Sequence, residues 1–270
     1  MKRTSVSKLI KNGELVFTQQ DSFSYVLDSA ELENVSSLVL KKGARINLLL
    51  LDDAATKLKI VLKENSSLDF KSLNTFEIKN SEKTFDLRAN TELKLSFADF
   101  SAGKGVEKVT VNLLGRNAKC NWFLSSISTQ KDNKEFKVSI NHIAPDTTAT
   151  VDSYGVAKDE SRLVFSGVSH IQTNAQKSKT KQNARIMVFS RDAIAVAKPI
   201  LKIDENDVQA GHAAALGQVN EEHLFYLRSR GLSENEAKTL IIMGYLKPIL
   251  RNFEDEEIKQ RIEKLILERV

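Results

Sequence analysis

His212 is the residue of this sequence whose type and surroundings best suit chemistry. It lies in the apolar run Val208–Gly217, next to Gly211 and three alanines, and such small neighbours leave room for a close partner beside its ring. An imidazole changes its charge near neutral pH and is a common metal ligand. Two interpretations stay open: a buried histidine with satisfied hydrogen bonds, or a residue that faces a ligand or another subunit.

Short catalytic and metal-binding motifs are absent from the rest of the sequence. There is no P-loop, G-x-G-x-x-G, H-E-x-x-H, C-x-x-C or G-x-S-x-G pattern, so the chain does not resemble an NTPase. The single cysteine, Cys120, excludes an internal disulfide and a multi-cysteine zinc site. It stands two residues before Trp122 in an alternating run, where a small buried hydrophobe is its expected role.

Composition and charge limit the classes of protein to which this chain could belong. The net charge of +5 is a small surplus on 40 basic and 35 acidic residues, so we expect a mixed solvated surface and no nucleic-acid binding. No run reaches the roughly 18 apolar residues that a transmembrane helix needs, and no apolar signal-peptide core follows the basic N-terminus. The expected compartment is the cytoplasm, without membrane attachment.

Short alternating segments fill residues 1–218. In each of them apolar side chains fall at about every second position, which is the period of a strand, and polar turns with Gly, Asn or Asp separate them. The segments are Ser36–Lys42, Leu58–Glu64, Thr84–Ala89, Glu92–Phe97, Lys108–Leu114 and Glu135–Ile143. The turns recur roughly every 20 to 30 residues, which favours a β-solenoid, although an antiparallel sandwich stays open.

The last part of the chain, residues 219–270, has helical signals. Asn220 and the first-turn acids that follow it predict a short helix that ends at Gly231. Ser233 and Glu236 form a capping box for a second helix, which Pro248 bends or ends. A third helix is expected from about Asp255 to the end. We therefore divide the chain into a strand-rich core over 1–218 and a small helical domain over 219–270.

Four blocks of the second half resemble one family closely. They occur in a specific order and spacing, and they cover about half of the chain: His142–Val168, Ala175–Ala193, Lys198–Gly217 and Asn220–Tyr245. Together they are similar to SufD, of the SufB/SufD family of iron–sulfur cluster assembly proteins. The first 130 residues match only as β-rich sequence, and the chain is expected to lack the N-terminal helical domain common in the family.

The resemblance implies a mainly β fold: a right-handed parallel β-helix followed by C-terminal helices. It implies a scaffold without turnover of its own, which pairs with a SufB-like paralogue through the β-helix and docks a SufC-type ATPase through its helices. The residue matching His212 is a proposed cluster or iron ligand at the paralogue interface. The segment Ser233–Leu250 would contact the ATPase, with candidate side chains Leu240, Ile241, Tyr245 and Leu246.

One departure from the family bears on the metal chemistry. Members of the family usually have a cysteine two residues before the histidine, where this chain has Ala210. On a strand these two residues share a face, so the usual pair would offer a thiolate and an imidazole to one metal. With Ala210, His212 needs ligands from a partner chain or from a second copy of this chain. We expect no cofactor bound stably by this chain alone, and a transient iron or iron–sulfur cluster at a partner interface.

The leading hypothesis is therefore a SufD-like scaffold subunit that is not an enzyme. Two alternatives stay open: a β-solenoid that acts on polysaccharide, and a purely structural homodimer in which His212 only packs.

Overall fold

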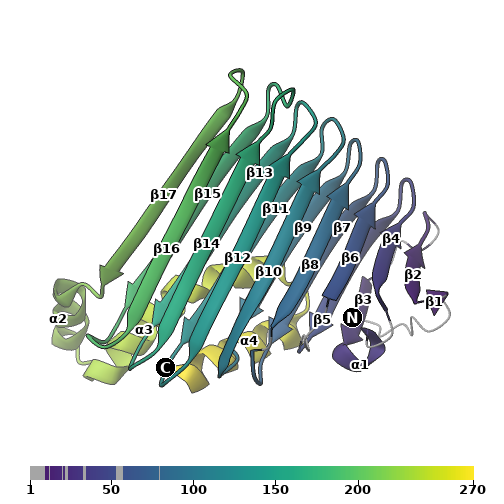
Figure 1. Cartoon of the computed structure of the whole chain (residues 1–270). Helices are drawn as coiled ribbons and strands as arrows, with labels where there is room; N and C mark the ends of the chain where they lie inside the picture. The colour runs from purple at the N-terminus through teal and green to yellow at the C-terminus, as the bar shows by residue number, and fades with distance from the viewer. Residues whose placement is uncertain are drawn as a thin grey trace.

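The computed structural model describes residues 10–11, 13–19, 21, 24–32, 35–52, 57–78 and 80–270. The expectation about a leader at the basic N-terminus falls on residues outside this range. From β2 onwards, successive strands alternate between two sheets, and almost all neighbours within a sheet are parallel (Figure 1). This is a parallel β-solenoid, as the sequence predicts, and the sandwich alternative is wrong.

Within the described residues, the first sheet contains nine strands and the second contains eight. The first sheet is built from β1 (Ile10–Lys11), β2 (Glu14–Phe17), β4 (Ser37–Leu40), β6 (Lys57–Leu62), β8 (Ser81–Leu87), β10 (Lys104–Leu113), β12 (Asn133–His142), β14 (Arg162–Ile171) and β16 (Ile194–Ile203). The second is built from β3 (Ser24–Asp28), β5 (Arg45–Leu51), β7 (Ser67–Asn74), β9 (Glu92–Asp99), β11 (Lys119–Ser128), β13 (Thr148–Ala157), β15 (Lys179–Val188) and β17 (Gln209–Gln218). A short helix, α1 (Ser29–Leu32), follows β3.

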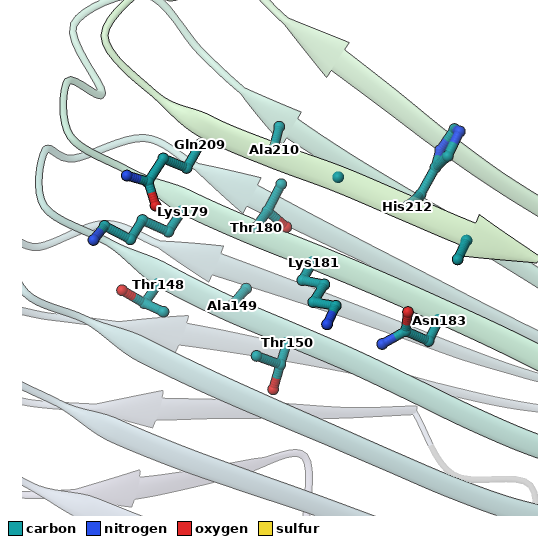
Figure 2. Close-up of a pocket in the computed structure, with 12 residues that line it drawn as sticks. Thr148, Ala149, Thr150, Lys179, Thr180, Lys181, Asn183, Gln209, Ala210 and His212 are labelled. Atoms are coloured by element: carbon teal, nitrogen blue, oxygen red, sulfur yellow. The ribbon is translucent and has the colours of Figure 1, made fainter.

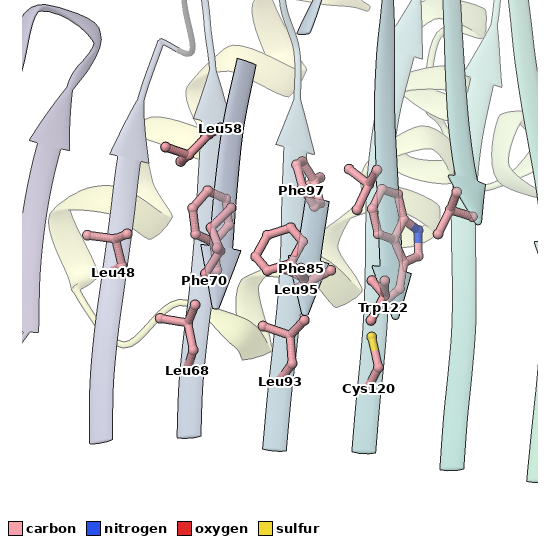
Figure 3. Packing of buried hydrophobic residues seen from close by; sticks show 14 of the residues in the cluster. Leu48, Leu58, Leu68, Phe70, Phe85, Leu93, Leu95, Phe97, Cys120 and Trp122 are labelled. Atoms are coloured by element: carbon pink, nitrogen blue, oxygen red, sulfur yellow. The ribbon is translucent and has the colours of Figure 1, made fainter. Parts of the chain in front are cut away.

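The alternation of apolar residues produces columns of stacked side chains inside the solenoid. Residues that face each other in a parallel ladder point the same way, so each inward position continues from coil to coil. One such column in the second sheet consists of Leu48, Phe70, Leu95, Trp122 and Val151. Figure 3 shows part of this packing, in which the rings of Phe97 and Trp122 stack at 4.6 Å. Each coil buries its apolar face only because the next coil covers it.

The turns at one end of the coils depend on residues that tolerate a left-handed backbone. Asn65, Asn90 and Asn117 have φ near +60°, a region that asparagine enters more readily than most residues. The side-chain amide of Asn90 donates to Asn65 at 3.2 Å, and that of Asn117 donates to Asn90 at 3.1 Å. The asparagine-containing turns of the sequence therefore stack into a hydrogen-bonded ladder.

The C-terminal helices begin and end near the residues that the sequence predicts. They are α2 (Glu221–Ser229), α3 (Glu234–Leu246), the 3₁₀ helix η2 (Lys247–Asn252) and α4 (Glu256–Arg269). Asn220 caps α2, the capping box of Ser233 and Glu236 begins α3, and Asp255 caps α4. Pro248 lies in the first turn of η2, where a missing backbone N–H costs nothing.

α3, η2 and α4 pack against the solenoid. Their buried apolar side chains, among them Ile242, Leu246 and Ile262, join Phe100 and Ile127 of the β-rich part in one cluster. The hydroxyl of Ser125 in β11 donates to the carbonyl of Leu246 at 3.1 Å. In the part of the chain that the structure describes, none of the helices has the length and apolar character needed to cross a membrane.

Candidate functional site

β17 ends the second sheet, and among the described strands β15 is its single neighbour there (Figure 1). The backbone N–H of Gln209 donates to Ser178 at 3.0 Å, and that of Val219 donates to Val188 at 3.2 Å. A strand in a parallel ladder uses alternate residues on each side. The N–H and C=O groups of Ala210, His212 and the other even-numbered residues of β17 therefore point to the open edge, where a further strand could pair with them.

His212 lies at the end of an interior column. In the ladders, Val151 is opposite Gln182, and Gln182 is opposite His212. Ala210 and His212 thus project from the same side of β17, as Figure 2 shows. Both are exposed, because no later coil covers them. Within the described residues the imidazole of His212 has no hydrogen-bond or ion-pair partner, so the interpretation as a buried, satisfied histidine is wrong.

The open end of the solenoid also exposes large apolar side chains. Of the nine that are exposed in the described residues, four lie on the last two strands: Ile194, Ile200, Ile203 and Leu216. Leu216 and Ile203 continue interior columns, since they are opposite the buried Ile186 and Ile171. At the last coil these interior columns are exposed to solvent. An exposed apolar surface of this kind is suited to binding another protein.

Polar groups lie directly beneath this end. The side chain of Gln182 is buried, and its amide nitrogen donates to the Ser169 hydroxyl at 2.6 Å and to the Ile200 carbonyl at 3.3 Å. The hydroxyl of Thr180 donates to Ser169 at 2.9 Å. A Cβ at Gly167 would lie 2.5 Å from the side-chain carbonyl oxygen of Gln182, so a larger residue there would require the Gln182 side chain to shift. The interior column changes from apolar to polar one coil before His212.

The residues around His212 do not form a metal site of their own. No group of three or more His, Cys, Asp or Glu side chains in the described part of the chain could hold a metal ion. The one thiol, Cys120, belongs to the same column as Ala210 but is buried two ladder steps beyond Thr180. Burial raises the pKa of the Cys120 thiol to about 12, so it stays protonated and inert.

The candidate helical residues differ in accessibility. Leu240 is 53% exposed and Ile241 is half-buried. The ring of Tyr245 packs edge-on against Tyr154 of β13 at 5.7 Å, and burial raises the pKa of Tyr245 to about 12. Leu246 is fully buried. Leu240 and the half-buried Ile241 and Tyr245 are therefore the candidates that a partner could touch in this conformation, and Leu246 is not.

Two further exposed side chains of this region were not predicted. Phe225 and Tyr226 on α2 are 74% and 57% exposed. A signal was present in the sequence, because four consecutive apolar residues, Leu224–Leu227, cannot all face one side of a helix. Together with Leu240 they give α2 and α3 an exposed apolar surface.

Comparison with known proteins decides the family. The family model of the SUF system FeS cluster assembly SufBD core domain matches residues 16–245, which is most of the chain. This chain belongs to the SufBD core family. It is 27% identical over 261 residues to the iron–sulfur cluster assembly protein SufD of Bacillus subtilis (strain 168), a match that covers 92% of this chain and 57% of the relative.

Two staphylococcal SufBD family proteins match a shorter part. The one from Staphylococcus saprophyticus is 27% identical over 139 residues, and the one from Staphylococcus epidermidis (strain ATCC 12228) is 26% identical over the same length. Each of these matches covers 52% of this chain and 30% of the relative. The matches of this chain thus span between about a third and little more than half of the length of these curated relatives.

The SufBD core match ends at Tyr245. It therefore contains the strands from β3 onwards, α2 and nearly all of α3, while η2 and α4 follow it. The open β17 edge and the exposed residues of α2 and α3 both lie inside the matched region.

A buried histidine of the SufBD core lies away from the open end. His142 ends β12, and its Nδ1 is 2.8 Å from the hydroxyl of Thr147. Its Nε2 is buried and has no hydrogen-bond partner within the described residues. Burial lowers the pKa of His142 to about 4. The strand period predicts this inward position, because His142 shares its parity with the buried Phe136, Val138 and Ile140.

We expect His142 to make the folded state sensitive to mild acid. Because its folded pKa is about 4 and the unfolded value is about 6.5, the unfolded chain binds the proton first as the pH falls. The contribution of His142 to the free energy of unfolding is fully present above pH 6.5 and is lost progressively as the pH falls toward 4. The loss between pH 7.5 and pH 5 is expected to be about 2 kcal/mol, measured by urea unfolding. His142→Leu should flatten this dependence, and an unchanged slope in that variant would contradict the assignment.

Proposed function

We propose that this chain is a SufD-like scaffold subunit of the SUF system, working in the cytoplasm. It pairs with a SufB-like paralogue through β17 and docks a SufC-type ATPase through α2 and α3. The strand-rich core over 1–218 would then be the part that pairs with the paralogue, and the helical domain over 219–270 the part that docks the ATPase. The observation that carries the proposal is the uncovered β17 edge, in a chain of the SufBD core family.

Pairing through the last coil is supported by two properties of that coil. The open backbone groups of Ala210, His212 and the other even residues of β17 can hydrogen-bond an added strand. The apolar side chains around them, including Leu216 and Ile203, lose contact with water when a second solenoid covers the end. A second copy of this chain could use the same edge, which makes a homodimer the alternative assembly.

The proposed cargo is iron or an iron–sulfur cluster, held at the interface between two subunits. This chain would contribute the imidazole of His212 and, with Ala210 in the adjacent position, no thiolate. Iron–sulfur clusters are held by thiolates in most cases, so the partner would supply them. The scaffold itself is proposed to catalyse no reaction. The alternative of a polysaccharide-acting solenoid is dropped, since the chain belongs to the SufBD family.

The test of the proposal is reconstitution. The chain is mixed with the SufB-type and SufC-type proteins of the same source at about 10 µM, and the complex is sized by chromatography with light scattering. A ternary complex is expected. Separate elution of this chain at that concentration would refute the proposed scaffold role, and a stable homodimer would favour the alternative assembly.

Leu240→Asp is expected to weaken binding of the SufC-type protein at least about tenfold. The side chain is 53% exposed, so the substitution places a charge on the proposed docking surface without unfolding α3. Leu267→Asp on α4 is the matched control, because that side chain is 52% exposed and also helical. Affinities are measured by titration calorimetry. Equal losses in both variants would argue against docking at α3.

His212→Ala is expected to reduce cluster loading of the reconstituted complex severalfold while leaving its assembly intact. The reason is that removing the imidazole takes away a ligand but leaves the edge of β17 unchanged. Loading is followed by the visible absorption of the cluster. Gln218→Ala, which changes an exposed polar residue on the same side of β17, is the control. Normal loading of the His212 variant would leave this residue with a packing role alone.

A further inference from the structure

A hollow of about 400 Å³ lies across β13, β15 and β17 (Figure 2). Its charged side chains are Lys179 and Lys181, which share the outer face of β15 with Asn183. Thr148, Thr150 and Gln209 supply further polar groups from the neighbouring strands. Figure 2 shows Lys181, Asn183 and Thr150 projecting on the side of the strands opposite to Ala210 and His212.

The charge in this hollow is unbalanced. Among its twelve lining residues there is no Asp or Glu. Lys179 and Lys181 are exposed, and neither has an ion-pair partner among the described residues. Two carboxylates lie near the hollow: Asp152 accepts from the amide of Asn183, which is one of the lining residues, at 2.7 Å, and Asp146 pairs with Arg116 at 3.1 Å. Asp146 and Asp207 line an adjoining hollow, to which Lys177 and Lys179 also contribute. The lining itself therefore carries two lysines and no carboxylate, and neither lysine is held in an ion pair within the described residues.

Beside these lysines, the outer face of β17 carries small residues. Gly211 and Ala213 line the hollow. A Cβ at Gly211 would meet nothing within 4 Å, so packing inside this chain does not require glycine there. A glycine inside a strand weakens it, and such a glycine often marks a place where a ligand or another backbone approaches closely.

From these observations we infer that the hollow binds a small ligand through a phosphate or pyrophosphate group. Ammonium and hydroxyl groups are donors that phosphate oxygens accept from. The volume suits a ligand of nucleotide size. The two lysines are two residues apart on one strand face, so their Cα atoms lie about 7 Å apart. Their flexible side chains can converge on one phosphate or hold two. This inference does not depend on the proposed function.

The test is calorimetric titration of the full chain with pyrophosphate and, separately, with ADP, at low ionic strength. We expect saturable binding of one ligand per chain. The Lys179→Ala/Lys181→Ala double variant is expected to raise Kd about tenfold, because it removes both cations of the hollow. Tighter binding of ADP than of pyrophosphate assigns the site to a nucleotide-like ligand. Equal affinities assign it to the phosphate groups alone.

The matched control is Lys57→Ala/Lys59→Ala. These lysines have the same spacing on the exposed face of β6, where Lys59 lies 3.4 Å from Asp86, and neither of them lines the hollow of about 400 Å³. The control removes the same charge, so an unchanged Kd is expected. An equal rise of Kd in both double variants, or no saturable binding to the unmodified chain at millimolar pyrophosphate, would overturn the inference.

Discussion

Replacing Ala214 with proline is expected to abolish the proposed pairing through β17 while leaving the fold intact. The N–H of Ala214 points to the open edge, since the N–H groups of Gln209 and Val219 donate to β15 and the ladder alternates between them. Proline is tolerated on an edge strand where its missing N–H faces solvent, and there it prevents a further strand from pairing. Loss of several backbone hydrogen bonds, each contributing about 1 kcal/mol, should weaken the complex with the SufB-type partner at least about a hundredfold.

The measurement is the dissociation constant of the complex, with circular dichroism as the check on folding. The neighbouring substitution Ala215→Pro is an informative contrast. Its N–H points to β15 by the same alternation, so this variant should lose part of the last coil itself. If Ala214→Pro pairs as well as the unmodified chain, the partner does not add to the edge of β17, and the proposed mode of assembly is wrong.

Lys134→Met is expected to destabilise the fold by about 3 to 5 kcal/mol. The Lys134 side chain is fully buried, and its ammonium group donates to the Asp99 carboxylate at 2.7 Å and to the carbonyls of Ser101 and Ile127. Burial lowers its pKa, and the adjacent Asp99 opposes that effect. Without the lysine, the buried carboxylate of Asp99 loses its cation and retains neutral donors, among them the Ser101 hydroxyl at 3.0 Å.

Chemical unfolding measures this effect. The Lys134→Met/Asp99→Asn double variant should recover more than half of the loss, because it removes the unpaired charge as well. Lys131→Met is the control: Lys131 and Glu160 are 3.9 Å apart and both largely exposed, so the loss should stay below about 0.5 kcal/mol. A single variant at Lys134 that unfolds like the unmodified chain would show that the buried pair adds nothing to stability.

Most of the fold was predictable from local patterns. The strand period located β9, β10 and β12, the asparagine turns located the ends of the coils, and Asn220 and Ser233 located two helix starts. These signals work because each depends on a few adjacent residues. The same parity that places Phe136 inside also places Lys134 inside, so a buried lysine was foreseeable there. The identity of its partner, Asp99, depends on the stacking of coils.

The candidate site was less predictable. Whether His212 is buried or exposed depends on the absence of a covering coil after β17, and a local pattern cannot contain that information. Leu240 and Leu246 are both apolar residues of α3, but one is exposed and the other is buried beneath β11 and its neighbours. The difference arises from which side of the helix meets the solenoid. The hollow beside Lys179 and Lys181 joins three strands that are distant in sequence.

The C-terminal helices affect how the solenoid comes apart. Tyr245 packs on β13, whereas Arg261 lies 3.6 Å from Asp52 and donates to the Thr75 hydroxyl at 3.3 Å, several coils away. In a plain solenoid each coil contacts its immediate neighbours, so unfolding can proceed gradually from one end. Here one segment ties early and late coils together, so the coils cannot separate one at a time, and unfolding should be a single cooperative transition. A force applied to α3 by a docked partner would accordingly be shared by many coils.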